Sequence, residues 1–329
     1  MAKNKKTGYP FVSLVVVNFN GKDILKKCLP SLFRLNYPKK KYEIIVVDNN
    51  STDGSREFLK NKYPEIKIVK NKKNMGYAGI NSAIKHCKGD YVYFLNNDLT
   101  LEKNCLKYLV QEIGKDSSIG MVAHNAVNYF QKDIVSGGTW VSRAMYCGHY
   151  PKDDDRLTKV IPYLGGGMIR KEIMLKFGYL FDPDYFIYAE DLDLGLRIRI
   201  LGMKVILVTN ALCYHMHSVT TRKFSTPSKN TFLLERNLLM TFLKIFSLKN
   251  IILYGPLVLI ARIFSILKDL ASLRVPNAMA RIKAIAWVII HLGLIVRKRQ
   301  QIQKLRKTDD SYILEVFSEK YILKKPFLI

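Results

Sequence analysis

The chain has 329 residues, 48% of them hydrophobic, which is enough for one large domain or for a domain with an extension. Its formal net charge of +26 implies an anionic partner, such as a nucleic acid, an anionic membrane or a phosphorylated substrate. The five cysteines are scattered and form no CxxC pair, so the sequence gives no sign of a zinc knuckle and fits a reducing compartment.

Strand and helix signals alternate through the first third of the chain. Apolar, often β-branched runs predict buried strands over 12–17, 43–47, 66–69 and 91–95, and the stretches between them predict helices over 23–35, 56–62 and 77–87. Strands separated by helices indicate a parallel sheet with helices on both faces. Ligands of such sheets bind at the carboxyl ends of the strands, where Asp48 and Asp98 lie.

The middle of the chain is less regular. Residues 125–160 are rich in Gly, aromatic and charged residues and predict loops with short strands. A Gly-rich turn over 164–167 then leads into a predicted helix over 168–177. A further helix is predicted over 191–201, followed by a strand over 204–208.

The last hundred residues have a different composition. Residues 236–308 contain fourteen Lys or Arg and one acid, Asp269, beside the apolar runs 251–261 and 284–296. Each run is shorter than the roughly 20 residues of a membrane-spanning helix, and Arg262 interrupts the first. We therefore predict basic amphipathic helices at a membrane interface; the alternative is a helical appendage packed on the main domain.

Several common nucleotide and hydrolase motifs are absent. The sequence has no GxxxxGK[ST], no GxGxxG after the first strand and no GxSxG. What remains is a set of acids at strand and helix ends. Asp48 follows EIIVV and is suited to bind a base or ribose, or else caps the next helix. Asp98 follows YVYFL and is suited to hold a divalent cation on a diphosphate.

Two further clusters carry chemistry. Glu190 and Asp191 open a helix, where acids are favourable by themselves, but with Asp193 they make three acids in four residues, more than a cap needs. Neighbouring carboxylates raise one another's pKa, which suits a general base. His215 and His217 would share one face of a strand, either as metal ligands or as ordinary surface or core residues.

Taken together, these stretches resemble family 2 inverting glycosyltransferases of the GT-A fold, in the rhamnosyltransferase-like branch. The resemblance covers about residues 11–221 and rests on VVVNFNG (15–21), IIVVDNNSTDGS (44–55), NMGYAGINSAI (74–84), YVYFLNNDLT (91–100), the stretch from GGGMIRKEI to RIRILG (165–202) and His215. It implies a Rossmann-like, mixed but mostly parallel sheet flanked by helices. The catalytic domain would occupy residues 1–228, and a C-terminal membrane-associated helical region residues 229–329.

The resemblance also implies site residues. Asp191 looks like the catalytic base with Glu190 beside it, and Asp98 and His215 look like contacts of a metal ion, Mg²⁺ or Mn²⁺. Asn96 replaces the first acid of the family's metal motif. Asp48 looks like the contact of the nucleotide base. The other predicted substrate-binding residues are Asn18, Asn20, Asn50, Asp53, Asn74, Gly76, Asn81, Asn96, Asn97, Gly166 and Gly167.

The implied reaction moves a sugar from a nucleoside-diphosphate donor, UDP- or dTDP-linked, to a hydroxyl of a glycan or lipid-linked acceptor, with inversion. Such an enzyme would be cytoplasmic, peripheral or monotopic at the cytosolic membrane face, and would serve cell-envelope polysaccharide synthesis. A sugar nucleotidyltransferase is the main alternative, but VVVNFNGKD lacks that class's Gly-rich basic loop. A nucleic-acid-binding protein is the non-enzymatic alternative. We expect no nucleic-acid partner, because the charge is densest beside apolar runs and no aromatic-basic RNA motif is present.

Overall fold

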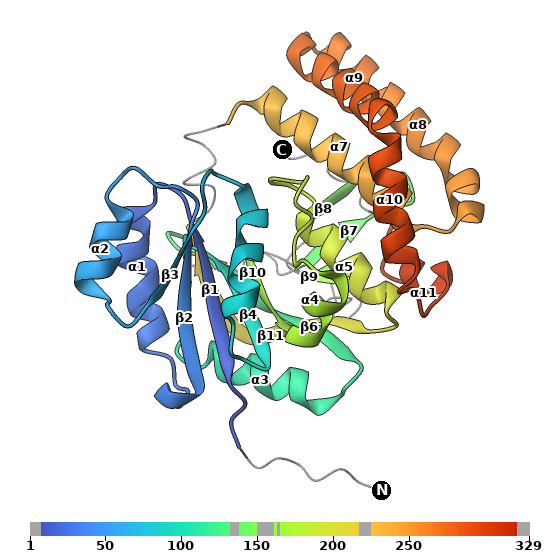
Figure 1. Cartoon of the computed structure of the whole chain (residues 1–329). Helices are drawn as coiled ribbons and strands as arrows, with labels where there is room; N and C mark the ends of the chain where they lie inside the picture. The colour runs from blue at the N-terminus through green and yellow to red at the C-terminus, as the bar shows by residue number, and fades with distance from the viewer. Residues whose placement is uncertain (1–7, 132–137, 150–160, 163–164, 217–224, 321–329) are drawn as a thin grey trace, which may run out of the picture.

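An eight-stranded mixed sheet forms the centre of the molecule, and helices cover both of its faces (Figure 1). The computed structural model describes residues 8–131, 138–149, 161–162, 165–216 and 225–320. The strands lie in the order β3-β2-β1-β4-β10-β6-β11-β5. Their bounds are β1 Val12–Asn18, β2 Tyr42–Asp48, β3 Lys67–Lys70, β4 Tyr91–Asn96, β5 Leu99–Leu101, β6 Ile119–Asn128, β10 Gly166–Arg170 and β11 Lys204–His215.

The first half of the sheet is parallel, as predicted. β1 pairs in parallel with β2 and β4, and β2 pairs in parallel with β3. The register sets Asn18 opposite Asp48 and Val17 opposite Asn96. Three strands therefore end at one edge of the sheet, and each ends in a polar residue.

The second half of the sheet mixes directions. β10 runs antiparallel between β4 and β6, β11 runs parallel to β6, and β5 is antiparallel to β11. A separate three-stranded sheet joins β7 Gly138–Val141, β8 Cys147–His149 and β9 Ile161–Pro162.

Alternating side chains of β1 fill two cores. Val12, Leu14 and Val16 pack in one cluster with residues of α1 (Lys22–Phe33), α2 (Ser55–Lys62) and α3 (Cys105–Lys115). Val15 faces the opposite cluster, with η2 (Gly76–His86), α4 (Lys171–Phe177) and α5 (Glu190–Ile200). Burial on both faces explains why residues 14–17 of β1 are all apolar and do not alternate with polar residues.

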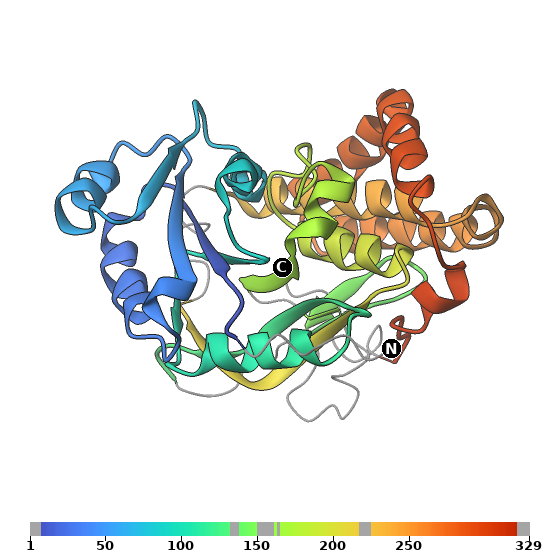
Figure 2. The ribbon, with the colours of Figure 1, turned by 60° about the horizontal axis from the view of Figure 1, so that its bottom comes forward.

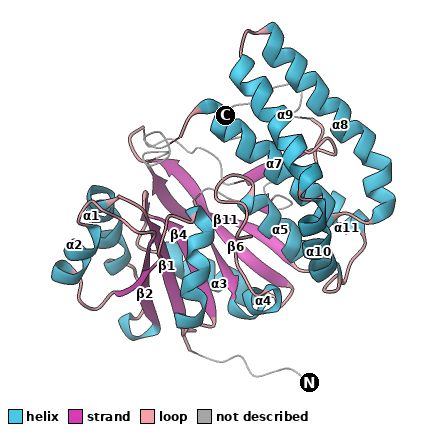
Figure 3. Cartoon of the chain, turned by 45° about the horizontal axis from the view of Figure 1, so that its top comes forward, coloured by secondary structure: helices cyan, strands magenta, loops and turns pink. Residues whose placement is uncertain are grey.

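The C-terminal helices pack beside α5 at one end of the sheet (Figures 2 and 3). They are α7 Pro227–Ile245, α8 Leu248–Ala271, α9 Val275–Ile290, α10 Leu292–Gln303 and α11 Asp310–Leu314; a short 3-10 helix, η1 Lys39–Lys41, precedes β2. Leu192 and Leu196 of α5 share a core with Leu238 and Phe242 of α7. The predicted boundary at residues 228 and 229 falls in the first turn of α7 and stays a prediction.

Three predicted elements differ from the structure. Residues 166–170 form strand β10, so the predicted turn over 164–167 and the start of the helix at 168 are wrong, and α4 begins at Lys171. The reason is tight packing between strands, since a Cβ on Gly167 would collide with the Met121 methyl group. The predicted strand over 204–208 continues to His215 through a bulge, and the predicted helix over 77–87 is the 3-10 helix η2.

Arg262 does not interrupt the apolar surface of α8. Its side chain is buried on the inner face, where the guanidinium lies 3.1 Å from a carboxylate oxygen of Glu235. Within the part of the chain that the structure describes, α8 is long and apolar enough to cross a membrane. α9 and α10 are long and apolar enough only when taken together, and the chain bends by 69° between them.

Candidate active site

Asp48 ends β2 as a fully buried carboxylate at the edge where the parallel strands finish. Its Oδ2 accepts a hydrogen bond from the Ser51 backbone N–H at 3.1 Å and lies 3.5 Å from Nε of Arg56. Its Oδ1 accepts no hydrogen bond from the described residues. A buried oxygen without a donor is costly unless a ligand supplies one, which is consistent with the predicted contact to a nucleotide base.

Ser51 joins Asp48 to the end of β1, a role that sequence reasoning missed. Its hydroxyl accepts from Nδ2 of Asn18 at 3.2 Å and from the backbone N–H of Asn20 at 2.9 Å. Asn18 in turn accepts from Nδ2 of Asn97 at 2.7 Å. The structure therefore brings four predicted residues, Asn18, Asn20, Asp48 and Asn97, into one hydrogen-bonded group.

Asp53 and Asn50 shape the loop after β2. Asp53 accepts from the backbone N–H of Lys22 at 2.7 Å and of Ser55 at 3.0 Å, so it fixes the starts of α1 and α2. Burial alone would raise the pKa of Asp53, but the hydrogen bonds from Ser55 and Lys22 outweigh it and lower that pKa. Asn50 is exposed, with a φ of +66°. Contacts of these two residues with substrate stay predictions.

The turn before η2 lies against the segment that precedes α5. Asn74 Oδ1 accepts from the N–H of Gly76 at 2.9 Å, and Gly76 has a φ of +59°. A Cβ on Gly76 would collide with the Phe186 carbonyl oxygen, which also accepts from the Tyr77 N–H at 2.8 Å. Only glycine fits both the backbone angle and the close approach.

Asn81 ties η2 to the same segment. Its Oδ1 accepts from the backbone N–H groups of Leu180 and Phe181 at 2.9 and 3.1 Å, and its Nδ2 donates to the Phe181 carbonyl at 2.7 Å. Asn49 and Asn71, two buried residues that were not predicted, continue this network to the Gly76 carbonyl. These side chains hold the loops of the site in place, and the predicted contact of Asn81 with substrate remains a prediction.

Asp98 follows the end of β4 and faces His215, the last residue of β11. Nε2 of His215 lies 3.2 Å from Oδ1 of Asp98, and both side chains are buried. Two neighbouring ligands of an octahedral Mg²⁺ or Mn²⁺ are about 3 Å apart when each bond is about 2.1 Å, so this pair fits such an ion. Among the described residues no group of three or more His, Cys, Asp or Glu side chains could hold a metal. A metal here would need oxygens from a diphosphate and water. The other predicted histidine, His217, lies outside the described residues.

Asn96 bonds to η2 and to the residue before β10. Its Nδ2 donates to the Tyr77 hydroxyl, and its backbone N–H donates to the Gly165 carbonyl at 2.8 Å. Gly166 and Gly167 lie inside β10, paired with Leu95 and Phe94, where their lack of side chains serves strand packing. Their predicted role in substrate binding stays untested.

Glu190 and Asp191 begin α5. The preceding residues Phe186, Tyr188 and Ala189 have φ values of +65°, +72° and +58°, which is uncommon for residues with side chains. Burial, then the charge of Asp191, raises the pKa of Glu190 well above its ordinary value. Burial, with a further contribution from Asp193, raises the pKa of Asp191 to about 6. A partly exposed carboxylate that titrates near neutral pH is suited to act as a general base.

A family model matches the first half of the chain. Residues 13–176 match the model described as Glycosyl transferase family 2, a range that contains Asp48 and Asp98. The chain belongs to glycosyl transferase family 2.

Curated relatives of this family 2 protein are themselves transferases. A poly(ribitol-phosphate) beta-glucosyltransferase of Bacillus spizizenii is 30% identical over 191 residues, which are 55% of this chain and 28% of that protein. A Methanococcus voltae enzyme, dolichyl N-acetyl-alpha-D-glucosaminyl phosphate 3-beta-D-2,3-diacetamido-2,3-dideoxy-beta-D-glucuronosyltransferase, is 25% identical over 236 residues, 65% of this chain and 69% of that protein. The chain thus spans under a third of the first relative and about two thirds of the second.

Solved structures confirm the predicted GT-A fold. The mannosyltransferase PcManGT from Pyrobaculum calidifontis, in complex with GDP-Man and Mn²⁺, matches with a TM-score of 0.55 at 18% identity, over 97% of this chain and 89% of that one. TarS from S. aureus in complex with UDP matches with a TM-score of 0.56 at 15% identity, over 97% and 93%. The rhamnosyltransferase-like branch stays a prediction.

The third acid of the α5 cluster has a structural role in this family 2 protein. Asp193 is fully buried, and its Oδ2 lies 2.7 Å from Nε of Arg197. Its Oδ1 lies 2.8 Å from Nζ of Lys244, which also pairs with Asp182 at 2.6 Å. The buried ion pairs join α5 to α7, so Asp193 explains why the cluster has more acids than a helix cap needs.

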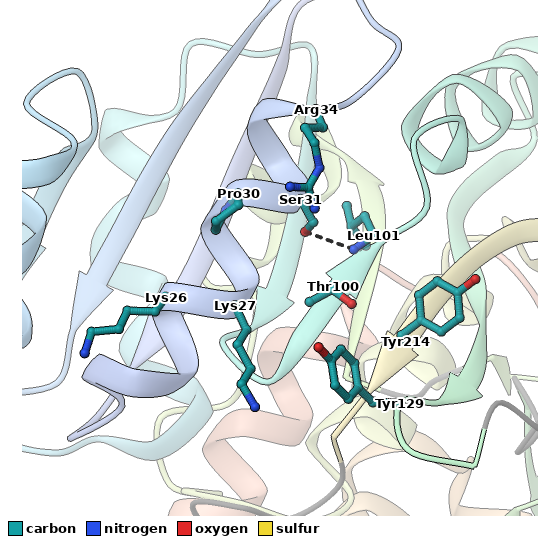
Figure 4. A pocket seen from close by; sticks show the side chains of 9 residues that line it. All are labelled: Lys26, Lys27, Pro30, Ser31, Arg34, Thr100, Leu101, Tyr129 and Tyr214. Atoms are coloured by element: carbon teal, nitrogen blue, oxygen red, sulfur yellow. Dashed lines mark hydrogen bonds between the residues drawn. The ribbon is translucent and has the colours of Figure 1, made fainter.

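A pocket of about 430 Å³ lies between α1 and the strands β5 and β11 (Figure 4). It is lined by Lys26, Lys27, Pro30, Ser31, Arg34, Thr100, Leu101, Tyr129 and Tyr214. Tyr214 precedes His215 on β11, and neighbouring residues of a strand point to opposite faces of the sheet. The pocket therefore lies beside α1, and none of its lining residues is a predicted site residue.

Proposed function

We propose that the protein is a metal-dependent, inverting glycosyltransferase that uses a nucleoside-diphosphate sugar. The observation that carries this proposal is the place of Asp191 at the start of α5, directly after a segment whose Phe186 carbonyl accepts a hydrogen bond from Tyr77 of η2. Burial raises the pKa of Asp191 to about 6. The Asp98–His215 pair also supports it, because its spacing suits a divalent cation.

In this proposal Asp191 accepts the proton of an acceptor hydroxyl as that oxygen attacks the anomeric carbon of the donor sugar. The bond from that carbon to the diphosphate breaks, and its electron pair leaves with the diphosphate. One displacement with no covalent intermediate inverts the anomeric configuration. Asp98 and His215 would hold Mg²⁺ or Mn²⁺, which offsets the negative charge of the leaving diphosphate. Asp48 would accept a hydrogen bond from the nucleotide base.

The donor we propose is a UDP- or dTDP-sugar. The buried Oδ1 of Asp48 accepts no hydrogen bond from the described residues and can accept from the ring N–H of a pyrimidine base. The acceptor we propose is a glycan or lipid-linked precursor of a cell-envelope polysaccharide, in keeping with the poly(ribitol-phosphate) substrate named for the Bacillus relative.

A thermal-shift panel tests the donor. A ligand that binds only the folded chain raises its melting temperature. UDP- and dTDP-sugars with Mn²⁺ should raise the melting temperature by several degrees, and Asp98→Ala should remove the part of the rise that depends on Mn²⁺. No rise with any nucleotide sugar, with or without metal, would contradict the proposal.

We also propose that the C-terminal helices lie on the cytosolic surface of an anionic membrane. The outer faces of α8, α9 and α10 expose large apolar side chains, namely Leu248, Ile252, Leu253, Leu257, Leu259, Ile260, Ile263, Phe264, Leu267, Leu270, Val275, Met279, Ile282, Ile289, Ile290, Leu292 and Val296. Exposed cations, including Lys249, Arg274 and Lys283, lie among them. The one acid of residues 236–308, Asp269, is buried against Arg281. An apolar face with cations and no exposed acid matches an anionic lipid surface.

A further inference from the structure

The segment that leads into α5 is held in an unusual backbone conformation. Phe186, Tyr188 and Ala189 all have left-handed φ angles, and Glu190 and Asp191 follow at once. On one side the Phe186 carbonyl accepts from the Tyr77 N–H. A left-handed residue with a side chain persists only where its surroundings over-determine it, so the other side of the segment must also be held.

Asn237 of α7 provides that second contact. Its Nδ2 donates to the carbonyl oxygens of Tyr185, Ile187 and Tyr188 at 3.2, 3.0 and 2.7 Å. The side chain is fully buried, and its three acceptors span the residues on both sides of Phe186. These bonds connect positions about fifty residues apart in the chain, so they are tertiary contacts and not part of a local turn.

Arg236 fixes which way the Asn237 amide points. Its Nε and Nη2 donate to Asn237 Oδ1 at 3.0 and 2.8 Å. A guanidinium has only donors, so the amide oxygen must face Arg236 and the NH₂ group must face the loop. Arg236 also donates to the carbonyls of Asp184 and Tyr185 at 2.6 and 3.1 Å.

Glu235, the residue before Arg236, fixes the position of α7, the helix that carries Arg236 and Asn237. Glu235 is buried and pairs with Arg262 of α8 and Arg281 of α9. These ion pairs tie α7 to α8 and α9 at the turn from which Asn237 projects.

We infer that Asn237 is a positioning residue for Asp191: its amide holds the carbonyls of residues 185–188 so that the start of α5 presents the base to the acceptor. The inference rests on the proposed function. Asn237 acts through the backbone of residues 185–188, to which its amide donates. Loss of the amide donors should let the left-handed residues relax and displace Asp191, while Asp48 and Asn18 at the sheet edge keep their own partners.

Asn237→Asp tests this inference with little change of shape. The aspartate keeps an oxygen for Arg236 but turns its second oxygen toward the carbonyls of Ile187 and Tyr188, which lose the amide donor. The saturated rate of UDP and dTDP release from a mixture of UDP- and dTDP-sugars with Mn²⁺ should fall about 10- to 100-fold, since small displacements of a reacting group cost that much. The Kd of UDP with Mn²⁺ should change less than about threefold, since the hydrogen-bonded group around Asp48 at the sheet edge is intact.

Ser265→Ala is the matched control. Ser265 is buried in α8 and bonds to the Tyr146 hydroxyl and the Ala261 carbonyl, so its loss removes buried hydrogen bonds away from the loop. Its saturated rate should stay within about twofold of the wild type. If Asn237→Asp does not fold, Asn237→Ser, which keeps one hydroxyl donor, is judged by the same rates and the same Kd.

The outcomes separate the two proposals. An unchanged rate in a folded Asn237 variant, or an equal fall in Ser265→Ala at the same loss of melting temperature, overturns the positioning role and leaves the proposed function standing. A fall in UDP affinity that accounts for the whole loss of rate also overturns it. A wild-type chain that binds UDP but releases no nucleotide from any sugar donor overturns both.

Discussion

Asp191 combines a raised pKa with partial exposure, and this fixes how the rate should depend on pH. Burial raises the pKa of Asp191 to about 6, above its ordinary value of 3.8. A base must be ionised to accept a proton, so the saturated rate should rise as pH increases through about 6 and then level off. Nucleotide release at saturating donor between pH 4.5 and 8 measures this. A rate that is flat over that range, while the melting temperature stays constant, would exclude Asp191 as the titrating base.

The Asp98–His215 pair, as the proposed ligands of a divalent cation, makes a separate prediction at the scale of residues. His215→Ala should reduce the stabilisation of the UDP complex by Mn²⁺, because it removes one of the two side chains that lie 3.2 Å apart. We expect apparent Mn²⁺ affinity to fall about 10- to 100-fold, the range seen when support of a metal site is lost. His86→Ala at the end of η2 is the control. Equal Mn²⁺ titrations for both variants would rule out His215 as a ligand.

Single residues could be predicted where a local signal marks them. Asp48, Asp98 and Asp191 each follow or open an element, so the sequence locates them. The roles of Ser51 and Asn237 were not predicted, because they come from partners far along the chain, such as Asn20 for Ser51 and Tyr188 for Asn237. A polar residue within a helix gives no local sign of a tertiary partner.

At the scale of elements, the position of α5 depends on a buried lysine. Lys244 of α7 pairs with Asp182 and Asp193, and all three side chains are fully buried. Lys244→Met leaves both carboxylates with one cation fewer, which should lower the free energy of unfolding by about 3 kcal/mol at pH 7.5. Urea unfolding measures the loss, and the exposed Lys249→Met is the control. A loss below about 0.5 kcal/mol, the usual range for surface changes, would contradict this account of α5.

The loss of stability caused by Lys244→Met should be smaller in acid than at pH 7.5. Burial alone would raise the pKa of Asp182, but Lys244 and Lys298 outweigh it and lower that pKa below its unfolded value. A depressed folded pKa stabilises the fold above the unfolded value of about 3.8, and this contribution is lost as pH falls below it. The stability gap between the wild type and Lys244→Met should therefore narrow below about pH 4. A gap that is equal at pH 3 and pH 7.5 would show that the ion pairs are not its source.

Elements could be predicted where their pattern is periodic, and not where packing overrides it. The parallel strands β1, β2 and β4 are apolar runs, and the sequence predicts each. β10 reads as a Gly-rich turn because its glycines meet neighbouring strands in space, which no local pattern reveals. Arg262 likewise reads as an interruption of an apolar run, although its charge is satisfied by Glu235 on another helix.

At the scale of the whole molecule, the C-terminal helices α8, α9 and α10 expose an apolar surface beside the sheet. Replacing Ile260, Phe264 and Leu267 together with serine should reduce binding to vesicles that contain anionic lipid, since it removes exposed apolar area from α8. Sedimentation with vesicles of phosphatidylglycerol and phosphatidylcholine measures the bound fraction. A variant with Phe130 and Leu175 changed to serine removes exposed apolar side chains elsewhere and is the control. Equal binding of both variants would contradict the membrane-facing assignment.

The most direct test of the whole account compares Asp191→Asn with the wild type in two assays on the same samples. We predict that asparagine leaves the Kd of UDP with Mn²⁺ within about threefold and lowers nucleotide release at least about 100-fold, because a general base contributes that much. It should also raise the melting temperature at pH 8 by a few degrees, since it removes a carboxylate whose ionised form is disfavoured by burial. Release that survives within about tenfold of the wild type, in a variant that still binds UDP, would contradict the assignment of Asp191 as the catalytic base.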